Sequence, residues 1–305
     1  MRQAARRSFD FLERCLSHAA EHWPQLSLSA GGHVGHLRNR LSQRWPSSEE
    51  VHTLFPSLNR HEAARVAWKI GGIDARNRIL GRYLERDRDR LLTWLMPRPA
   101  PALSRFHPPF ILGFFHVGAP QALGAVFEWL PVPVLALRLG IRKPAVPTLT
   151  VLTIEGSTQQ RALVFSRAMA HLQACGVVAS ALDFVSGPSL TVPFLGRSLE
   201  LARGPFAMAR LTGAPLVPLA ARWHGGIVDV EVGDELVADG FSSPEICERK
   251  LATAAAGWLE NYLRSDPGEM GLGLLHRLVL SSDEQVKRIA PARSSSPPAS
   301  LRRSS

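Results

Sequence analysis

The chain has 305 residues, of which 45% are hydrophobic and 20% are charged, a balance that excludes an intrinsically disordered protein and a bundle of membrane spans. The 36 Lys and Arg exceed the 26 Asp and Glu, and the formal net charge of +10 favours an anionic partner, either a nucleic acid or an anionic lipid surface. The three cysteines lie far apart without the spacing of metal ligands, which fits free thiols in a reducing compartment.

The N-terminal region, residues 1–105, is predicted to be helical and basic. Residues 1–106 hold 18 Lys and Arg against 10 Asp and Glu, a net of +8, so most of the excess positive charge lies there. Two uses of this charge remain open: a solvated helical face, or a surface that docks on acidic headgroups or an acidic carrier. Apolar or small side chains recur at helical period in a first predicted helix, at Phe9, Leu12, Leu16 and Ala20.

The rest of this region is predicted as helix after one interruption. LSLSAGGHVGHLRN, residues 26–39, contains three glycines and is predicted to break the helical pattern. SSEEVHTLF follows with Ser48 as its cap, and Asn59, three residues before Glu62, predicts a capping box at the start of the next helix. Residues 76–95 continue the helical pattern, with a polar face of alternating Arg, Asp and Glu.

A proline-rich segment, MPRPAPALSRFHPP, marks a boundary, and residues 106–288 are predicted to form an α/β domain. Short apolar runs (FILGFF, PVLALR, TVLTI, GVVASAL, APLVPLAARW and IVDVEVG) alternate with helix-like stretches, as in a sheet flanked by helices. The last of these stretches predicts a helix capped by Ser243, with Pro244 at its first position. Residues 289–305 are low in complexity and are predicted to be disordered.

The stretch FFHVGAPQALG, residues 114–124, places His116 at the end of a predicted buried strand. The tripeptide that starts at Gly118 predicts a turn that opens a helix, so His116 lies where open α/β sheets bind their ligands. Gln121, five residues on, falls in the first helical turn and can reach back toward the imidazole. A single histidine in an apolar segment is more often a satisfied core residue, so a catalytic and a structural role both remain open.

Two other positions are candidate binding residues. Arg197 follows Gly196 in a predicted turn, and its planar guanidinium suits a phosphate or a carboxylate, although a surface arginine in a loop is the simpler alternative. Asp183 ends the apolar run GVVASAL with a carboxylate that serves either as a cap or as a site residue.

Five segments, in order, resemble those of the bacterial late lipid A (lauroyl/myristoyl-type) acyltransferases of the lysophospholipid acyltransferase superfamily. They span roughly residues 50 to 280. FFHVGAPQ is similar to that family's signature of a histidine, four residues and a carboxylate, and the last segment holds the pair His276-Arg277. The other segments are LFPSLNRHEAARVAW, GVVASALDFVSG and VPFLGRSLELARGPFAMARLTGAPLVPLAAR.

The resemblance implies a glycerolphosphate-acyltransferase-like fold, with a central mixed sheet flanked by helices. It also implies transfer of a fatty acyl chain from acyl carrier protein or acyl-CoA to a hydroxyl of a lipid or glycolipid acceptor, without a cofactor or metal. His116 would be the general base, because an alcohol is a poor nucleophile until a base takes its proton. Arg197 and Gly196, with Asp183 and Gly118, would bind the substrates, and backbone N–H groups at a helix start would hold the oxyanion.

Gln121 departs from the family pattern, which has Glu or Asp at this position. A glutamine oxygen accepts the ring N–H but carries no charge, and in a serine-protease triad an acid-to-amide change lowers kcat about 10⁴-fold. Three alternatives follow. Another carboxylate, such as Glu155 or Asp183, replaces the missing acid; the enzyme is slow but sufficient; or the fold has become a lipid- or carrier-binding protein.

Other signals are weaker. HAAEH, at His18 to His22, matches a zinc-binding pattern that is short enough to arise by chance, and no nucleic-acid-binding signature accompanies the positive charge. The N-terminus lacks the continuous apolar core of a secretory signal, and prolines break the longest apolar region. These features predict a peripheral protein on the cytoplasmic side of the bacterial inner membrane, bound to its anionic surface.

Overall fold

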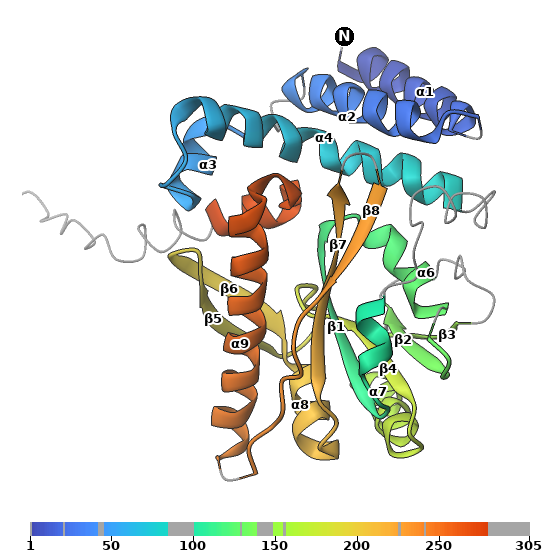
Figure 1. Cartoon of the computed structure of the whole chain (residues 1–305), viewed down its shortest axis with the longest axis vertical. Helices are drawn as coiled ribbons and strands as arrows, with labels where there is room; N and C mark the ends of the chain where they lie inside the picture. Colours follow the sequence, from blue (N-terminus) through green and yellow to red (C-terminus); the bar gives the residue numbers. More distant parts are fainter. Residues whose placement is uncertain are drawn as a thin grey trace, which may run out of the picture.

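The computed structural model contains a six-stranded sheet in the order β3-β2-β4-β1-β7-β8 (Figure 1). All neighbouring strands run parallel except β8, which pairs antiparallel with β7. The α/β class and the mixed sheet flanked by helices are therefore confirmed. The structure describes residues 2–20, 22–41, 46–84, 101–128, 130–138, 149–154, 157–224, 227–240 and 242–279.

Each predicted apolar run forms one strand of this sheet. Consecutive parallel strands need crossover connections, and helices supply most of them. The strands are β1 (Phe110–Gly118), β2 (Val134–Arg138), β3 (Thr150–Thr153), β4 (Val177–Ala181), β7 (Leu216–His224) and β8 (Ile227–Val232).

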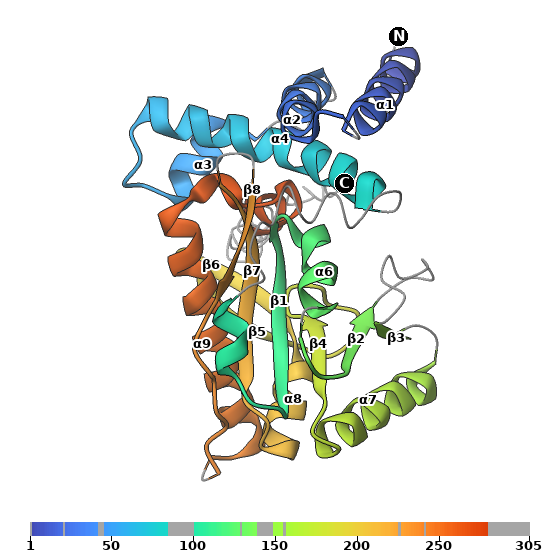
Figure 2. The ribbon, with the colours of Figure 1, turned by 45° about the vertical axis from the view of Figure 1, so that its right-hand side comes forward.

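Helices lie against both faces of the sheet (Figure 2). They bury apolar side chains there. One face packs against α7 (Thr158–Gln173), α8 (Arg203–Thr212) and α9 (Pro244–Ser265). The other face packs against α6 (Leu123–Glu128) and the 3-10 turns η1 (Pro101–Arg105) and η2 (Pro120–Ala122). Ser243 caps α9 and Pro244 starts it, as predicted. Because a hydrophobic core lies on each side of the sheet, the strands are buried on both faces and their sequences are nearly continuous apolar runs.

A two-stranded antiparallel hairpin lies outside the main sheet, and the sequence analysis did not identify it. Its strands are β5 (Ser189–Phe194) and β6 (Arg197–Ala202), and they join through a turn at Leu195 and Gly196. Alternate side chains of β5 are buried, the pattern of a strand with one face on the core. The hairpin packs beside α9, where the backbone N–H of Leu195 donates to Glu260.

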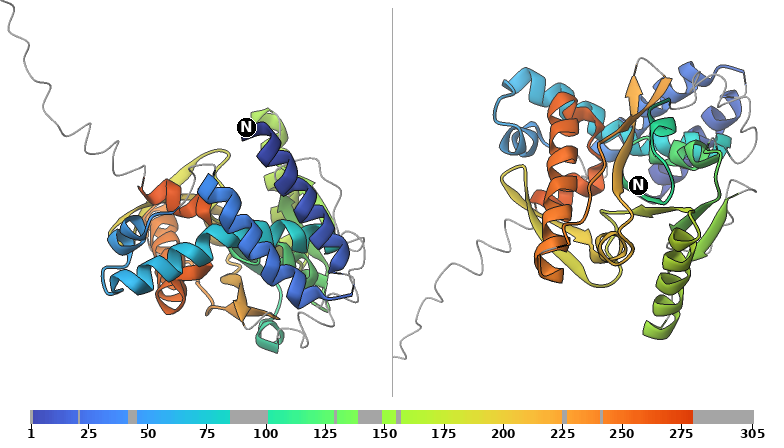
Figure 3. Two further views of the ribbon diagram at one scale, coloured as in Figure 1. Left: turned by 90° about the horizontal axis from the view of Figure 1, so that it is seen from above. Right: turned by 60° about the horizontal axis from the view of Figure 1, so that its bottom comes forward.

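Four N-terminal helices cover the end of the sheet at which β1 and β7 finish (Figures 1 and 3). They are α1 (Arg2–Ala19), α2 (Pro24–Leu41), α3 (Ser48–Leu54) and α4 (Arg60–Leu84). Buried residues of α3 and α4, Val51 and Ala67 among them, belong to the same hydrophobic core as α9. Among the described residues, no helix is long and apolar enough to span a membrane.

The predicted interruption at residues 26–39 is wrong, because α2 runs through all of it. Its glycines lie where α2 crosses α4. A Cβ at Gly31 would lie 2.2 Å from Ile79 Cδ1, one at Gly35 2.3 Å from Ala75 Cβ, and one at Gly72 of α4 2.6 Å from the Gly32 carbonyl oxygen. Glycine here permits close packing of two helices, at the expense of helix propensity.

The two predicted helix starts have different outcomes. The cap of α3 is Ser47, one residue before the predicted Ser48, and it forms a capping box with Glu50. The capping box at α4 is confirmed, because the Asn59 side chain accepts from the Glu62 N–H at 3.0 Å and the Glu62 carboxylate accepts from the Asn59 N–H at 2.8 Å. The helix predicted over 76–95 is the second part of α4 as far as Leu84.

Several predictions lie outside the described residues. They include the continuation of that helix over 85–95, the beginning of the proline-rich boundary at 96–100 and the tail at 289–305. The division into residues 1–105 and 106–288 stays a prediction.

Candidate active site

His116 lies two residues before the carboxyl end of β1, where the pairing of β1 with β7 shifts register between Phe114 and Gly118. Such an irregularity re-aims side chains and frees backbone groups from the ladder. The backbone N–H of His116 accordingly donates to the carboxylate of Asp183, at 3.2 and 3.1 Å from its two oxygens.

The same carboxylate holds the imidazole. Asp183 follows β4, the neighbour of β1, and its Oδ1 lies 2.8 Å from His116 Nδ1. The Asp183 side chain is 1% exposed, whereas that of His116 is 45% exposed. Since an ionised carboxylate only accepts, Nδ1 carries the proton and Nε2 is left as the basic nitrogen.

The pKa values of His116 and Asp183 are shifted away from each other. Burial lowers the pKa of His116, but the hydrogen bond and negative charge of Asp183 outweigh it, and the pKa lies above the ordinary value for histidine. Burial raises the pKa of Asp183, but the hydrogen bond and charge of His116, helped by Arg277, lower it further, so the carboxylate is ionised. The positive charge of Arg277 lowers the pKa of His116 in turn. The pair is therefore a base with an ionised acidic partner.

Gln121 is not placed on His116. It is exposed in η2, and its Cγ lies 3.5 Å from where a Cβ of Gly81 would be, so its side chain packs toward α4. The imidazole pairs instead with Asp183, one of the two replacements considered from the sequence. The other, Glu155, lies outside the described residues.

Arg277 approaches from the helical segment 272–279 and completes a three-residue cluster. Its Nη1 donates to the Asp183 carbonyl oxygen at 2.5 Å, and its Nη2 lies 3.4 Å from Asp183 Oδ2. Sequence reasoning gave this arginine no role. Its place beside His276 in the last of the five segments could have drawn attention to it. Spacing could not reveal its contact with Asp183, which lies 94 residues earlier.

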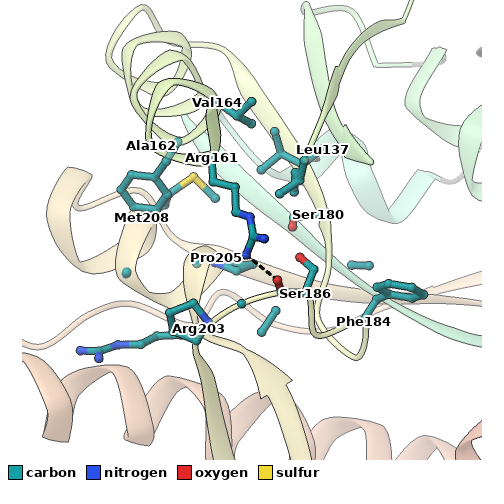
Figure 4. Close-up of a pocket in the computed structure, with 18 of the residues that line it drawn as sticks. Leu137, Arg161, Ala162, Val164, Ser180, Phe184, Ser186, Arg203, Pro205 and Met208 are labelled. Atoms are coloured by element: carbon teal, nitrogen blue, oxygen red, sulfur yellow. Dashed lines mark hydrogen bonds between the residues drawn. The ribbon is translucent and has the colours of Figure 1, made fainter. Parts of the chain in front are cut away.

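A cavity of about 930 Å³ opens beside His116. It lies between α7, α8 and the sheet, and its wall is mostly apolar (Figure 4). Arg161 of α7 donates to the Ser186 carbonyl oxygen at 2.8 Å across this wall. Aromatic rings border the histidine, since the centroids of Phe114 and Phe184 lie 5.7 and 5.9 Å from that of His116. The other lining residues include Leu137, Ala162, Val164, Phe165 and Met208.

The remaining predicted site residues lie elsewhere. Gly196 and Arg197 are at the tip of the β5–β6 hairpin, where Gly196 has φ +70°, and they do not line the cavity. Gly118 has φ +62°, and a Cβ there would lie 1.8 Å from the Ala221 carbonyl oxygen, so packing alone demands glycine. Within the described part of the chain, no three His, Cys, Asp or Glu side chains gather as a metal site.

A second buried carboxylate, Glu269, lies behind the end of β1. It is 3% exposed, it accepts from the backbone N–H of Trp223 at 2.9 Å, and a Cβ at Gly118 would lie 2.9 Å from its Oε2. Burial, with a smaller contribution from Asp266, raises its pKa to about 7 against the lowering effects of the Trp223 N–H, Lys69 and Arg76.

No protein-family model matches the sequence, and no curated protein matches it. The crystal structure of the 1-acyl-sn-glycerophosphate (LPA) acyltransferase PlsC from Thermotoga maritima is similar to this chain. The TM-score is 0.39 and the sequence identity 15%, over 75% of this chain and 97% of that chain. A likeness this distant says nothing about the reaction.

Proposed function

We propose that this protein is an acyltransferase that moves a fatty acyl chain from an acyl-carrier-protein or coenzyme A thioester to a hydroxyl of a lipid or glycolipid acceptor. The observation that carries the proposal is the pairing of His116 with Asp183 at the edge of a largely apolar cavity. A histidine oriented by a buried carboxylate activates an alcohol, and an apolar cavity suits an acyl chain. The order of the five sequence segments, which resembles the late lipid A acyltransferases, supports the same class.

His116 acts as the general base. Its Nδ1 is held by Asp183, so Nε2 takes the proton from the acceptor hydroxyl as that oxygen attacks the thioester carbonyl. Asp183 stabilises the imidazolium that forms, because its ionised carboxylate is fixed by both the ring and the backbone N–H of His116. When the tetrahedral intermediate collapses, the carbon–sulfur bond breaks and the imidazolium returns the proton to the departing thiolate. The products are an ester and a free thiol.

A backbone donor suited to the oxyanion lies at the start of α8, which no side chain caps. The backbone N–H of Arg203 already donates to the Pro188 carbonyl oxygen and Pro205 has no N–H, so the donor is the N–H of Gly204, which lines the cavity. Backbone N–H groups at a helix start carry partial positive charge, which favours a developing negative oxygen. The acyl chain of the donor then extends along the apolar wall formed by Leu137, Val164 and Met208. A volume of about 930 Å³ lies within the range of roughly 300–1,000 Å³ typical of ligand cavities.

The N-terminal helices supply a surface for an anionic membrane, on the cytoplasmic side of the bacterial inner membrane. Large apolar side chains are exposed there, with Phe11 of α1 60%, Trp23 64% and Leu26 of α2 68% exposed. These helices lie beyond the carboxyl edge of the sheet, the edge that carries His116 (Figure 1). Exposed apolar and basic side chains together favour binding at the surface of an anionic bilayer.

The test is mass spectrometry of lipid extracts, and of the acyl carriers freed of their acyl chain, from cells with and without the protein. The measurement is repeated with purified protein and either an acyl-carrier-protein or an acyl-CoA donor. A new acylated product is expected, and its mass names the acceptor class. His116→Ala removes the base and should abolish the product. His224→Ala is the matched control, because His224 is exposed at the carboxyl end of the neighbouring strand β7.

An unchanged lipid profile, or a product that is indifferent to His116→Ala, would contradict the proposal. If acceptor lipid or acyl carrier still bound without turnover, the protein would instead be a lipid- or carrier-binding relative of the enzymes that the sequence resembles.

A further inference from the structure

Arg277 carries a positive charge to the open side of the His116–Asp183 pair. Its side chain is 47% exposed and that of His116 45%, whereas the Asp183 side chain between them is 1% exposed. The two exposed groups therefore meet solvent on either side of one buried carboxylate. Arg277 itself does not line the cavity that His116 borders.

The fold fixes the position of this arginine. Gly271, just before the helical segment 272–279, is buried against the end of β1, and a Cβ there would lie 3.2 Å from the His116 carbonyl oxygen. Hydrogen bonds to the Asp183 carbonyl and carboxylate then hold one edge of the guanidinium. A guanidinium has five N–H donors in a rigid fork, so donors remain for a ligand outside the cavity.

The charges at the site are already balanced. With His116 neutral, the positive charge of Arg277 and the negative charge of Asp183 cancel. When the imidazole takes a proton, the oxyanion that forms in the same step balances the new positive charge. An anion therefore binds here through the remaining donors of the exposed guanidinium, and not through a net charge of the site.

Arg277 differs from the described cations near the cavity in contacting Asp183 itself. Arg203 and Arg210 both bind the buried carboxylate of Glu248, and Arg161 donates to the Ser186 carbonyl oxygen. Arg197, the residue suggested by the sequence, lies at the tip of the β5–β6 hairpin.

We infer that Arg277 binds the phosphate group of the acceptor lipid, outside the acyl cavity, and so sets the preference of the enzyme for phosphorylated acceptors. This inference rests on the proposed acyl transfer. It separates the two substrates in space: the acyl chain enters the apolar cavity on one side of His116, and the acceptor phosphate lies at Arg277 on the other. A phosphate could equally belong to the phosphopantetheine arm of the donor, and the kinetic arms of the test distinguish these sources.

The kinetic test compares two acceptors that differ only in the phosphate, lysophosphatidic acid and the monoacylglycerol of the same chain length. Arg277→Gln should raise KM for lysophosphatidic acid at least tenfold and leave KM for monoacylglycerol and for the donor within about twofold, as expected for a lost charge-assisted hydrogen bond. Arg277→Lys keeps the charge without the fork and should be intermediate. Arg264→Gln, which removes an exposed arginine paired with Glu260 on α9, is the control.

A binding readout makes the inference independent of turnover. Inorganic phosphate is titrated while the imidazole signals of His116 are followed by NMR in the wild type, Arg277→Gln and Arg264→Gln. The signals should move with phosphate in the wild type and in Arg264→Gln, and should lose that response in Arg277→Gln.

The outcomes separate the two claims. If the wild type transfers no acyl group but phosphate still shifts His116 through Arg277, the proposed function fails and the anion site stands. If Arg277→Gln slows both acceptors equally, raises the KM of the donor or leaves the phosphate response intact, Arg277 only supports Asp183 and the inference is overturned.

Discussion

Two buried carboxylates flank the end of β1, and their surroundings give them opposite properties. Asp183 and Glu269 are 2% and 3% exposed, so burial penalises their charged forms alike. Asp183 contacts the imidazole and the backbone N–H of His116 and the guanidinium of Arg277, and its pKa is lowered. Glu269 accepts one backbone N–H, its cationic neighbours act only at longer range, and its pKa is raised to about 7. Paired partners, and not exposure, decide which carboxylate is ionised.

Removing the charge of Asp183 should have the largest effect. Asp183→Asn keeps the side-chain shape but leaves the imidazolium unstabilised and permits the wrong tautomer, so kcat should fall about 10³- to 10⁴-fold. Initial rates at saturating donor and acceptor measure it. Asp239→Asn, which removes a carboxylate paired with Lys250 near the start of α9, should leave kcat unchanged. A loss of less than tenfold in Asp183→Asn would show that the charge is not needed.

Removing the charge of Glu269 should act on stability. Its pKa is about 7 in the folded chain against 4.5 for an ordinary glutamate, so its contribution is complete below about pH 4.5 and is lost as the pH rises through 7. Glu269→Gln should remove this loss and raise the free energy of unfolding at pH 8 by about 3 kcal/mol, since one pKa unit corresponds to about 1.4 kcal/mol. Urea unfolding at pH 5 and pH 8 measures it. Equal pH slopes in the variant and the wild type would refute the assignment.

The pH dependence of the rate should follow Asp183 and ignore Glu269. A general base must be unprotonated, so kcat/KM should fall as the pH drops through the raised pKa of His116, above the ordinary value of 6.5. Asp183→Asn removes the cause of the raised pKa and should move this acidic limb to lower pH. Glu269→Gln should leave the limb in place. If the acidic limb moved in Glu269→Gln and not in Asp183→Asn, Glu269 and not Asp183 would be the carboxylate that sets the pKa of His116.

Adding a third carboxylate should change least. Gln121→Glu introduces a carboxylate five residues after His116, but this side chain is exposed and packs toward Gly81. The rate should therefore change by no more than about fivefold, as for an exposed charge worth up to roughly 1 kcal/mol. A large gain in initial rate would mean that Gln121 reaches His116 during turnover.

The sequence was sufficient where structure depends on near neighbours. The apolar runs became strands, and the caps at Asn59 and Ser243 start the helices predicted for them. The same local rules failed for α2, because its glycines serve a crossing with α4 that lies about forty residues away in the chain. A glycine that admits a second helix cannot be distinguished by sequence from one that ends a helix.

The candidate site likewise has one residue that local sequence predicts and two that depend on long-range contacts. His116 was predicted from its place after an apolar run, and it lies near the carboxyl end of β1. Its partner could be named only as one alternative among several, because the contact depends on β4 lying beside β1. Arg277 depends in addition on the position of Gly271 against β1. Long-range contacts of this kind follow from sheet topology, which spacing in one sequence does not specify.

The distance along the chain between the members of the site also governs when it forms. A carboxylate five residues from the histidine would reach it within one turn of chain, but Asp183 lies 67 residues from His116, and Arg277 lies 94 residues from Asp183. Closing loops of this length is slow compared with forming helices. During refolding, the helices should therefore appear before catalytic competence, which has to wait until β1 and β4 have paired and the segment after α9 has docked.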